Sequence, residues 1–132
     1  MANLQEMVAV NLLKQESASD RLQGVIWGAK VADQHSNILT ELMTTLNNDP
    51  NVNVRLAAAN ALYLYRNNPH IKEGLINSLT LQDSPLVQIA LVDLLVEIKE
   101  EKALSALKEL IKANHLNPEV KKRAELGINQ LM

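Results

Sequence analysis

The amino-acid sequence repeats one pattern of apolar and small residues every 33 positions. Val54, Val87 and Val120 are spaced by this period. A fixed period in this range predicts a solenoid of stacked helical pairs rather than the core of a globular enzyme. The repeated columns are apolar or small, whereas one polar position changes from Arg55 to Gln88. The period therefore indicates repeated helix packing without a repeated chemical site.

Composition narrows the function classes. The chain has 132 residues, of which 47% are hydrophobic and 21% are charged, and this balance predicts one folded domain. Its formal net charge of −2 provides no attraction to phosphate backbones, and only three aromatic residues are available for base stacking. We therefore expect no nucleic-acid partner. The chain has no cysteine, which excludes disulfides, thiolate metal sites and a cysteine nucleophile.

Membrane and targeting signals are weak in this sequence. No apolar stretch approaches the ~18 residues that a spanning helix requires. The first residues lack the basic start and apolar run of a signal peptide. These observations predict a soluble chain without direct membrane insertion, and its abrupt helical start is also typical of a fragment of a longer protein.

Proline marks the helix starts. Each of the four prolines follows a residue that can cap a helix, in Asp49-Pro50, Asn68-Pro69, Ser84-Pro85 and Asn117-Pro118. A capping oxygen followed by proline favours a helix N-terminus, because proline presets φ and its missing N–H would have had no helical partner. Helices are therefore predicted to start near residues 50, 69, 85 and 118.

Apolar spacing between these starts is helical throughout, and it predicts eight helices in a single domain over residues 1–132. The predicted fold class is all-α, an α-α superhelix of about three and a half helical pairs with an N-terminal capping helix. The predicted boundaries are a leading helix in 1–18, pairs in 19–48, 49–82 and 83–116, and a closing helix in 117–132. Gly28 and Gly127 share a column with Ala61, where we expect neighbouring helices to approach closely.

The segment 49–62, Asp-Pro-x-x-x-Val-Arg-x-x-Ala-x-x-Ala-Leu, resembles a HEAT repeat, and residues 83–95 and 117–128 resemble it in turn. The resemblance covers residues 19–131. It implies an interaction scaffold in which an aspartate and an arginine form a ladder between successive turns. Asp49 and Arg55 fit this ladder, but Gln88 replaces the arginine in the next repeat. We therefore expect the apolar columns to contribute most of the stacking energy.

A narrower resemblance begins with Met7-Val-Ala-Val-Asn-Leu-Leu-Lys-Gln-Glu and continues to Val25. With the Asp-Pro-Asn-Val-Asn-Val-Arg segment and the segment from Gln82, it is similar to bacterial membrane proteins that resemble anti-sigma factors. Those proteins have an N-terminal zinc finger, a transmembrane helix and a C-terminal HEAT domain. The resemblance implies an extracytoplasmic sensory or scaffolding domain of an inner-membrane-anchored regulator. The alternative is a free-standing, cytoplasmic HEAT adaptor.

Catalytic chemistry has few candidates in this chain. His35, His70 and His115 fall near turns or helix ends, and no two have the spacing of metal ligands on one helix. Repeated His-Glu dipeptides and Gly-rich phosphate loops are absent from the sequence. We therefore predict no catalytic, cofactor-binding or metal residues and no enzyme activity. A small HEAT-like lyase is the alternative from another function class.

The remaining function is binding to a protein or peptide of unknown identity. In HEAT solenoids the second helix of each pair usually lines the concave face. The outward residues predicted there are polar and mixed in charge, as in a solvated face or a polar interface. The candidate partner-binding residues are Asn37, Thr40, Glu41, Thr44, Lys72, Glu73, Asn77, Ser105, Glu109 and Lys112. Thr45 and Ser78 are predicted on the same outward face.

The leading helix, residues 3–15, is amphipathic. Such a helix most often caps the first repeat of a solenoid by covering its apolar edge. Docking to a partner, or to a second copy in a homodimer through the terminal helices, is the alternative. Deletion of residues 1–16 distinguishes the two, since loss of stability indicates capping and loss of association alone indicates docking.

Overall fold

The computed structural model describes residues 4–34 and 36–132, with the side chains of residues 34 and 36 left aside, and every element in this part of the chain is helical. The all-α prediction is therefore confirmed. The elements are α1 (Leu4–Leu13), α2 (Ala18–Val31), a 3₁₀ turn η1 (Ala32–Gln34), α3 (Ser36–Asn48), α4 (Val52–Tyr63), α5 (Pro69–Leu81), α6 (Pro85–Glu97), α7 (Ala103–Ile111) and α8 (Pro118–Leu131). None of these helices combines the length and apolar character that spanning a bilayer requires.

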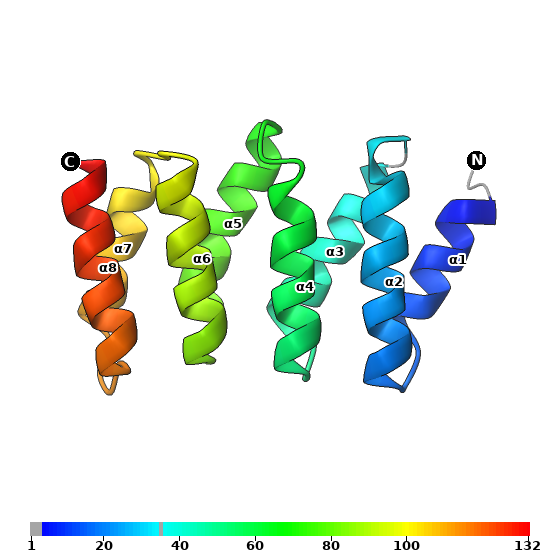
Figure 1. Ribbon diagram of the computed structural model, residues 1–132, viewed down its shortest axis with the longest axis horizontal. Coiled ribbons are helices and arrows are strands. Elements are labelled where there is room, and N and C mark those ends of the chain that lie inside the picture. The colour runs from blue at the N-terminus through cyan, green and yellow to red at the C-terminus, as the bar shows by residue number, and fades with distance from the viewer. Residues whose placement is uncertain (1–3, 35) are drawn as a thin grey trace. The chain divides into compact units, whose positions relative to one another are not determined.

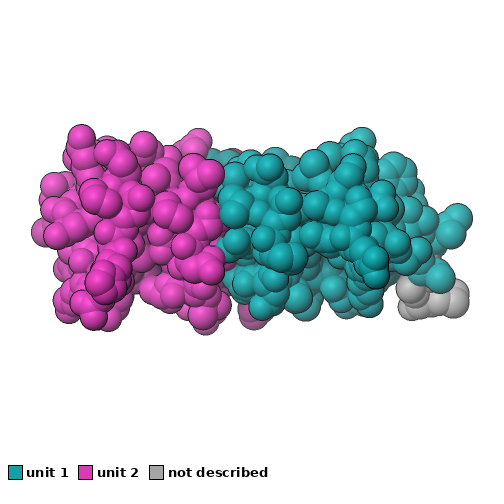
Figure 2. All heavy atoms as spheres, turned by 90° about the horizontal axis from the view of Figure 1, so that it is seen from below, with its two compact units in different colours: residues 1–65 teal, residues 66–132 magenta. Residues whose placement is uncertain are grey.

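The chain forms two compact units, residues 1–65 and residues 66–132 (Figure 2). In unit 1, α1 and α3 lie in one layer and α2 and α4 in the other (Figure 1). In unit 2, α5 and α7 lie in one layer and α6 and α8 in the other. We call α1 and α3 of unit 1, and α5 and α7 of unit 2, the second-helix layer of their unit, because α3, α5 and α7 are the second helices of the predicted pairs.

Helix α1 occupies a repeat position of its own. One 33-residue period beyond Leu4–Leu13 falls within α3 (Ser36–Asn48), and α1 packs against both α2 and α3. The predicted leading helix therefore corresponds to the second helix of a pair. Its buried side includes Ala9 and Leu13, which close the apolar core of unit 1.

Three of the four predicted helix starts agree with the structure. Helices α5, α6 and α8 begin at their prolines, after Asn68, Ser84 and Asn117. The Asn68 side chain accepts a hydrogen bond from the backbone N–H of His70 at 2.9 Å, as an N-cap should. Ser84 precedes its helix without a side-chain cap hydrogen bond.

The start predicted at Asp49-Pro50 is wrong by two residues. Helix α4 begins at Val52, and its N-cap is Asn51, whose side-chain oxygen accepts from the N–H of Asn53 at 2.9 Å. Asp49 accepts from Arg21 on α2, with Nε 2.8 Å from Oδ2, and its Oδ1 also accepts from the backbone N–H of Asn51 at 2.9 Å. Asp49 therefore closes the turn before the helix and binds α2, while Asn51 caps the helix.

The repeated columns form the core of each unit. Val54 in unit 1 and Val87 and Val120 in unit 2 are fully buried. Gly28 and Gly127 lie at close helix contacts, as predicted. A Cβ atom on Gly127 would approach Cγ2 of Val96 to 2.9 Å, and one on Gly28 would approach Cγ2 of Ile38 to 3.0 Å. The core therefore depends on small residues where helices meet.

Candidate functional site

A cleft of about 540 Å³ lies along the contact between α1 and α3, on the second-helix layer of unit 1. Glu6, Met7, Val10, Asn11 and Lys14 line it from α1, and Asn37, Thr40 and Glu41 line it from α3. We call this the α1–α3 cleft. Three predicted binding residues (Asn37, Thr40 and Glu41) lie together in it, because they follow one another at helical spacing along the exposed side of α3.

A buried carboxylate lies at one end of the α1–α3 cleft. Glu6 is 8% exposed, and its Oε1 accepts a hydrogen bond from Nδ2 of Asn37 at 3.2 Å. This contact connects the two helices that form the walls. Burial of a carboxylate requires such polar partners, so Asn37 helps to hold Glu6 at the cleft.

Two charged side chains in the α1–α3 cleft have no ion-pair partner among residues 4–34 and 36–132. They are Glu41, which is half-buried, and Lys14, which is exposed. Glu41 lies one helical turn beyond Asn37. The carboxylates of Glu6 and Glu41 therefore border the end of the cleft at which Asn37 lies.

The remaining predicted residues of α3 differ in exposure. Thr44 is exposed, and its hydroxyl donates to the backbone oxygen of Thr40 at 3.1 Å. The prediction for Thr45 is wrong, because it is buried and its hydroxyl donates to the backbone oxygen of Glu41 at 2.9 Å. Thr45 falls on the core side of the helix, and back-bonding within the helix satisfies its hydroxyl.

Unit 2 contains a second cleft, of about 510 Å³, at its own second-helix layer. Its lining comes from α5 and from the segment before α7, and we call it the α5 cleft. The lining residues are Pro69, Lys72, Glu73, Ile76, Glu100 and Lys102. Lys72 and Glu100 form an ion pair across it, with Nζ and Oε2 3.9 Å apart. The predicted residues Lys72 and Glu73 therefore lie in a cleft where Lys72 already has an ion-pair partner.

Five other predictions concern the second-helix layer of unit 2. Asn77 is exposed on α5, and Ser105 is exposed on α7. Glu109 and Lys112 form an exposed pair 3.7 Å apart, which indicates a solvated surface. The prediction for Ser78 is wrong, because it is fully buried and its Oγ accepts from Nε2 of Gln82 at 3.0 Å.

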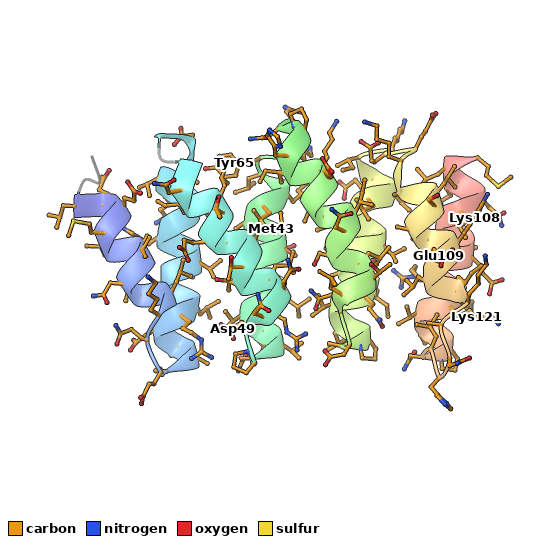
Figure 3. All side chains as sticks on the ribbon, turned by 180° about the vertical axis from the view of Figure 1, so that it is seen from behind. Met43, Asp49, Tyr65, Lys108, Glu109 and Lys121 are labelled. Carbon is orange, nitrogen blue, oxygen red and sulfur yellow. The ribbon has the colours of Figure 1, made fainter. Side chains whose placement is uncertain are left out.

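One repeated column of the second helices changes its chemistry at α7. Met43 of α3 and Glu109 of α7, both labelled in Figure 3, are two 33-residue periods apart. Met43 is half-buried, whereas Glu109 is exposed. Val10 and Ile76 belong to the same column and are also half-buried, so the column is apolar in α1, α3 and α5 and charged in α7.

Histidine forms no site in the described residues. His70 and His115 are exposed, and His35 lies outside the described residues. In this part of the chain no group of three histidine, cysteine, aspartate or glutamate residues could hold a metal ion. His115 has a φ of 62°, in the left-handed region, at the turn between α7 and α8.

Sequence reasoning missed the contribution of α1 to the cleft. It assigned residues 3–15 to a cap, with docking to a partner or a second copy as the alternative, and did not place Glu6, Met7, Val10, Asn11 and Lys14 in a wall facing α3. The signal was present in the 33-residue period, since Val10 lies one period before Met43. Extending the repeat register towards the N-terminus would have assigned these residues to the same face as α3.

Comparison with known proteins identifies a protein family. A family profile described as HEAT repeats matches residues 39–129, which is more than half of the chain. No curated protein matches the sequence.

Proposed function

Because the chain belongs to the HEAT repeat family, of the α-α superhelix class, we propose that it is a non-enzymatic scaffold that binds another protein or a peptide through its second-helix layer. HEAT repeats are generally protein-interaction scaffolds, and their all-helical fold is typically non-catalytic. The observation that carries the proposal is the α1–α3 cleft, where three of the predicted binding residues lie together. The proposal takes residues 1–132 as one HEAT-repeat domain.

The proposed contact residues keep the polar and mixed character expected of a wet protein interface. In unit 1 they are Asn37, Thr40, Glu41 and Thr44, and in unit 2 they are Lys72, Glu73, Asn77, Ser105, Glu109 and Lys112. All of them are exposed or half-buried in the structure. A partner can therefore reach them without rearrangement of the core.

Site-specific photo-crosslinking in the native cell tests this face. The crosslinking residue replaces Thr40 in unit 1 or Asn77 in unit 2, and the matched control replaces Asn60, which is exposed on α4 in the other layer. We expect one protein, identified by mass spectrometry, to crosslink at Thr40 or Asn77 and not at Asn60. Equal yields at all three positions, or none at Thr40 and Asn77, would contradict the proposal.

The narrower resemblance of residues 7–25 supports a more specific role, as the extracytoplasmic sensory or scaffolding part of a bacterial membrane-anchored regulator. The alternative is a free-standing cytoplasmic adaptor. Sequencing the native gene upstream of Met1 separates these roles. A preceding membrane helix and a Cys/His-rich domain support the anchored regulator, whereas an in-frame stop codon directly upstream supports the adaptor.

The outer side of α1 supports self-association as part of the same proposal. Leu4 is 75% exposed, Met7 58% and Val8 39%, although α1 packs against α2 and α3. These apolar residues have the i, i+3, i+4 spacing of a helix-packing face. Sedimentation of the chain and of Leu4→Asp over a range of concentrations tests for a homodimer. A monomer for both proteins at every concentration would exclude this contact.

A further inference from the structure

We propose that the α1–α3 cleft binds a basic side chain, lysine or arginine, that lies beside an apolar residue in the partner protein. This inference rests on the proposed scaffold function and assigns the chemistry of its contact in unit 1. The cleft combines an apolar wall with a negative end. The wall would contact the apolar residue of the partner, and the negative end would bind its basic side chain.

The apolar wall comes from α1. Met7 is 58% exposed, and Val10 beside it is half-buried. An exposed, unbranched methionine can adapt to different partner side chains, and for this reason methionine is frequent on peptide-binding surfaces. The cleft volume of about 540 Å³ lies within the range of small-ligand sites, so it can hold a side chain and its neighbour.

The negative end comes from two helices. Glu6 on α1 is held by the amide of Asn37, and Glu41 follows Asn37 by one turn of α3. The half-buried carboxylate of Glu41 makes no ion pair within the described part of the chain. A cation from the partner would form a charge-assisted hydrogen bond there, which is stronger than a neutral one.

Lys14 does not cancel this charge at the same point. It lies eight residues after Glu6 on the same helical path, which corresponds to about 12 Å at a rise of 1.5 Å per residue. At physiological ionic strength the Debye length is about 8 Å, which is shorter than this backbone separation, so screening weakens the effect of the Lys14 ammonium at Glu6. The cleft therefore has separate negative and positive ends.

The α5 cleft shows why unit 2 is not the equivalent site. Two periods separate Glu6 from Lys72, and the same interval separates Val10 from Ile76. The apolar position is kept, but Lys72 replaces the glutamate and already pairs with Glu100 at 3.9 Å. A basic ligand would meet a lysine at this position, so selectivity for a cation is specific to unit 1.

Peptide titration of the full chain, followed by ¹⁵N NMR, tests the assignment. The probes are acetyl-Leu-Arg-Leu-amide and the same peptide with Gln or Glu in place of Arg. We expect saturable shifts of the Met7, Asn37 and Glu41 amides with the Arg peptide. Glu41→Gln should weaken Arg-peptide binding about three- to tenfold at low salt, to the level of the Gln peptide on the unaltered chain.

The matched control is Glu97→Gln, which removes one exposed carboxylate from α6, outside both clefts and outside the proposed contact residues, and should leave Arg-peptide binding unchanged. Equal responses to the three peptides, shifts confined to other residues, or unaltered binding by Glu41→Gln would each overturn the assignment. Crosslinking at Thr40 and Asn77 reports the scaffold function separately. If a partner is captured at those positions but the α1–α3 cleft does not bind the Arg peptide, this inference is wrong and the scaffold function still holds.

Discussion

Arg21 binds Asp49 through two hydrogen bonds, from Nε to Oδ2 at 2.8 Å and from Nη2 to Oδ1 at 3.2 Å. The Nη1 group of the same arginine donates to the backbone oxygens of Gln15 and Glu16, at 3.1 and 2.6 Å. One guanidinium therefore joins the α1–α2 connection to the α3–α4 connection within unit 1. Its side chain is 13% exposed and that of Asp49 is 5% exposed, so water competes little with these bonds.

Substitution Arg21→Lys should lower the melting temperature by several degrees. Lysine keeps the charge but cannot make two parallel bonds to a carboxylate while also reaching two backbone oxygens. The hydrogen bond that Arg21 donates to Asp49 raises the pKa of Arg21, so the native guanidinium stays charged throughout any practical pH range. Thermal unfolding monitored by circular dichroism measures the change.

The matched control for that experiment is Arg123→Lys in unit 2. Arg123 contacts Asp93 at 2.6 Å, but the two side chains are 45% and 48% exposed, and exposed ion pairs contribute little. We expect almost no change in its melting temperature. A similar decrease in both variants would show that burial of the Arg21 network is unimportant.

Substitution Tyr65→Phe should lower the free energy of unfolding by about 0.5–1.5 kcal/mol at neutral pH. The Tyr65 hydroxyl donates to the backbone oxygen of Ala29 at 2.6 Å. Ala29 lies in the last turn of α2, where carbonyl groups lack helical partners. Denaturant unfolding of both proteins measures the difference.

The effect of Tyr65→Phe should also depend on pH. Burial, with the charge of Asp33, raises the pKa of Tyr65 above its ordinary value of 10.0. The neutral tyrosine therefore contributes stability that is fully present below pH 10 and is lost as pH rises through its native pKa. The difference between the two proteins should narrow above pH 10. A constant difference from pH 8 to 11 would contradict the assigned hydrogen bond.

Substitution Gly24→Ala should destabilise the chain by about 1–3 kcal/mol, although alanine favours a helix more than glycine does. The new methyl carbon would lie 2.7 Å from the backbone nitrogen of Leu13 and 3.0 Å from the carbonyl carbon of Leu12. Backbone atoms cannot rotate away, so α1 and α2 must separate. Ser19→Ala, at an exposed position of α2, is the control and should not destabilise. Equal unfolding curves for Gly24→Ala and the unaltered chain would disprove this close contact.

Substitution Lys99→Gly should stabilise the chain by about 0.5–1 kcal/mol. Lys99 has a φ of 54°, and the N–H of Glu100 bonds to the oxygen of Leu95 at 3.2 Å, as in the glycine-type end of a helix. Glycine adopts this conformation without the steric cost of a Cβ atom. Lys108→Gly, within α7, should instead destabilise by about 1 kcal/mol. A loss of stability in Lys99→Gly would show that the lysine side chain itself supports the turn.

Sequence patterns predicted most of the helices because helix signals are local. Proline after Asn68 or Asn117 presets the first turn, and both helices begin at those prolines. The prediction failed at Asp49, which closes the preceding turn by accepting from the N–H of Asn51 and also binds Arg21, a residue 28 positions away. Asn51 caps the helix instead, and the contact with Arg21 could not be identified from neighbouring residues.

The candidate site was predicted only in part for the same reason. Asn37, Thr40 and Glu41 were placed together because helical spacing fixes which residues share a face. The partner of Asn37 was not predictable from α3, since Glu6 belongs to another helix. Thr45 and Ser78 were misplaced because their polarity indicated solvent. In the core, the Thr45 hydroxyl bonds within its own helix, and Ser78 accepts from Gln82 at the C-cap of α5.

The linear order of residues was sufficient to establish an all-α repeat protein, its 33-residue period and the small residues at helix contacts, because these depend on spacing along one chain. Packing decided which charges meet. It paired Arg21 with Asp49, placed Glu6 beside Asn37, and left Glu41 facing a cleft without an ion-pair partner in the described residues. Electrostatic partners are selected by distance in space, and that distance exists only once the helices have packed.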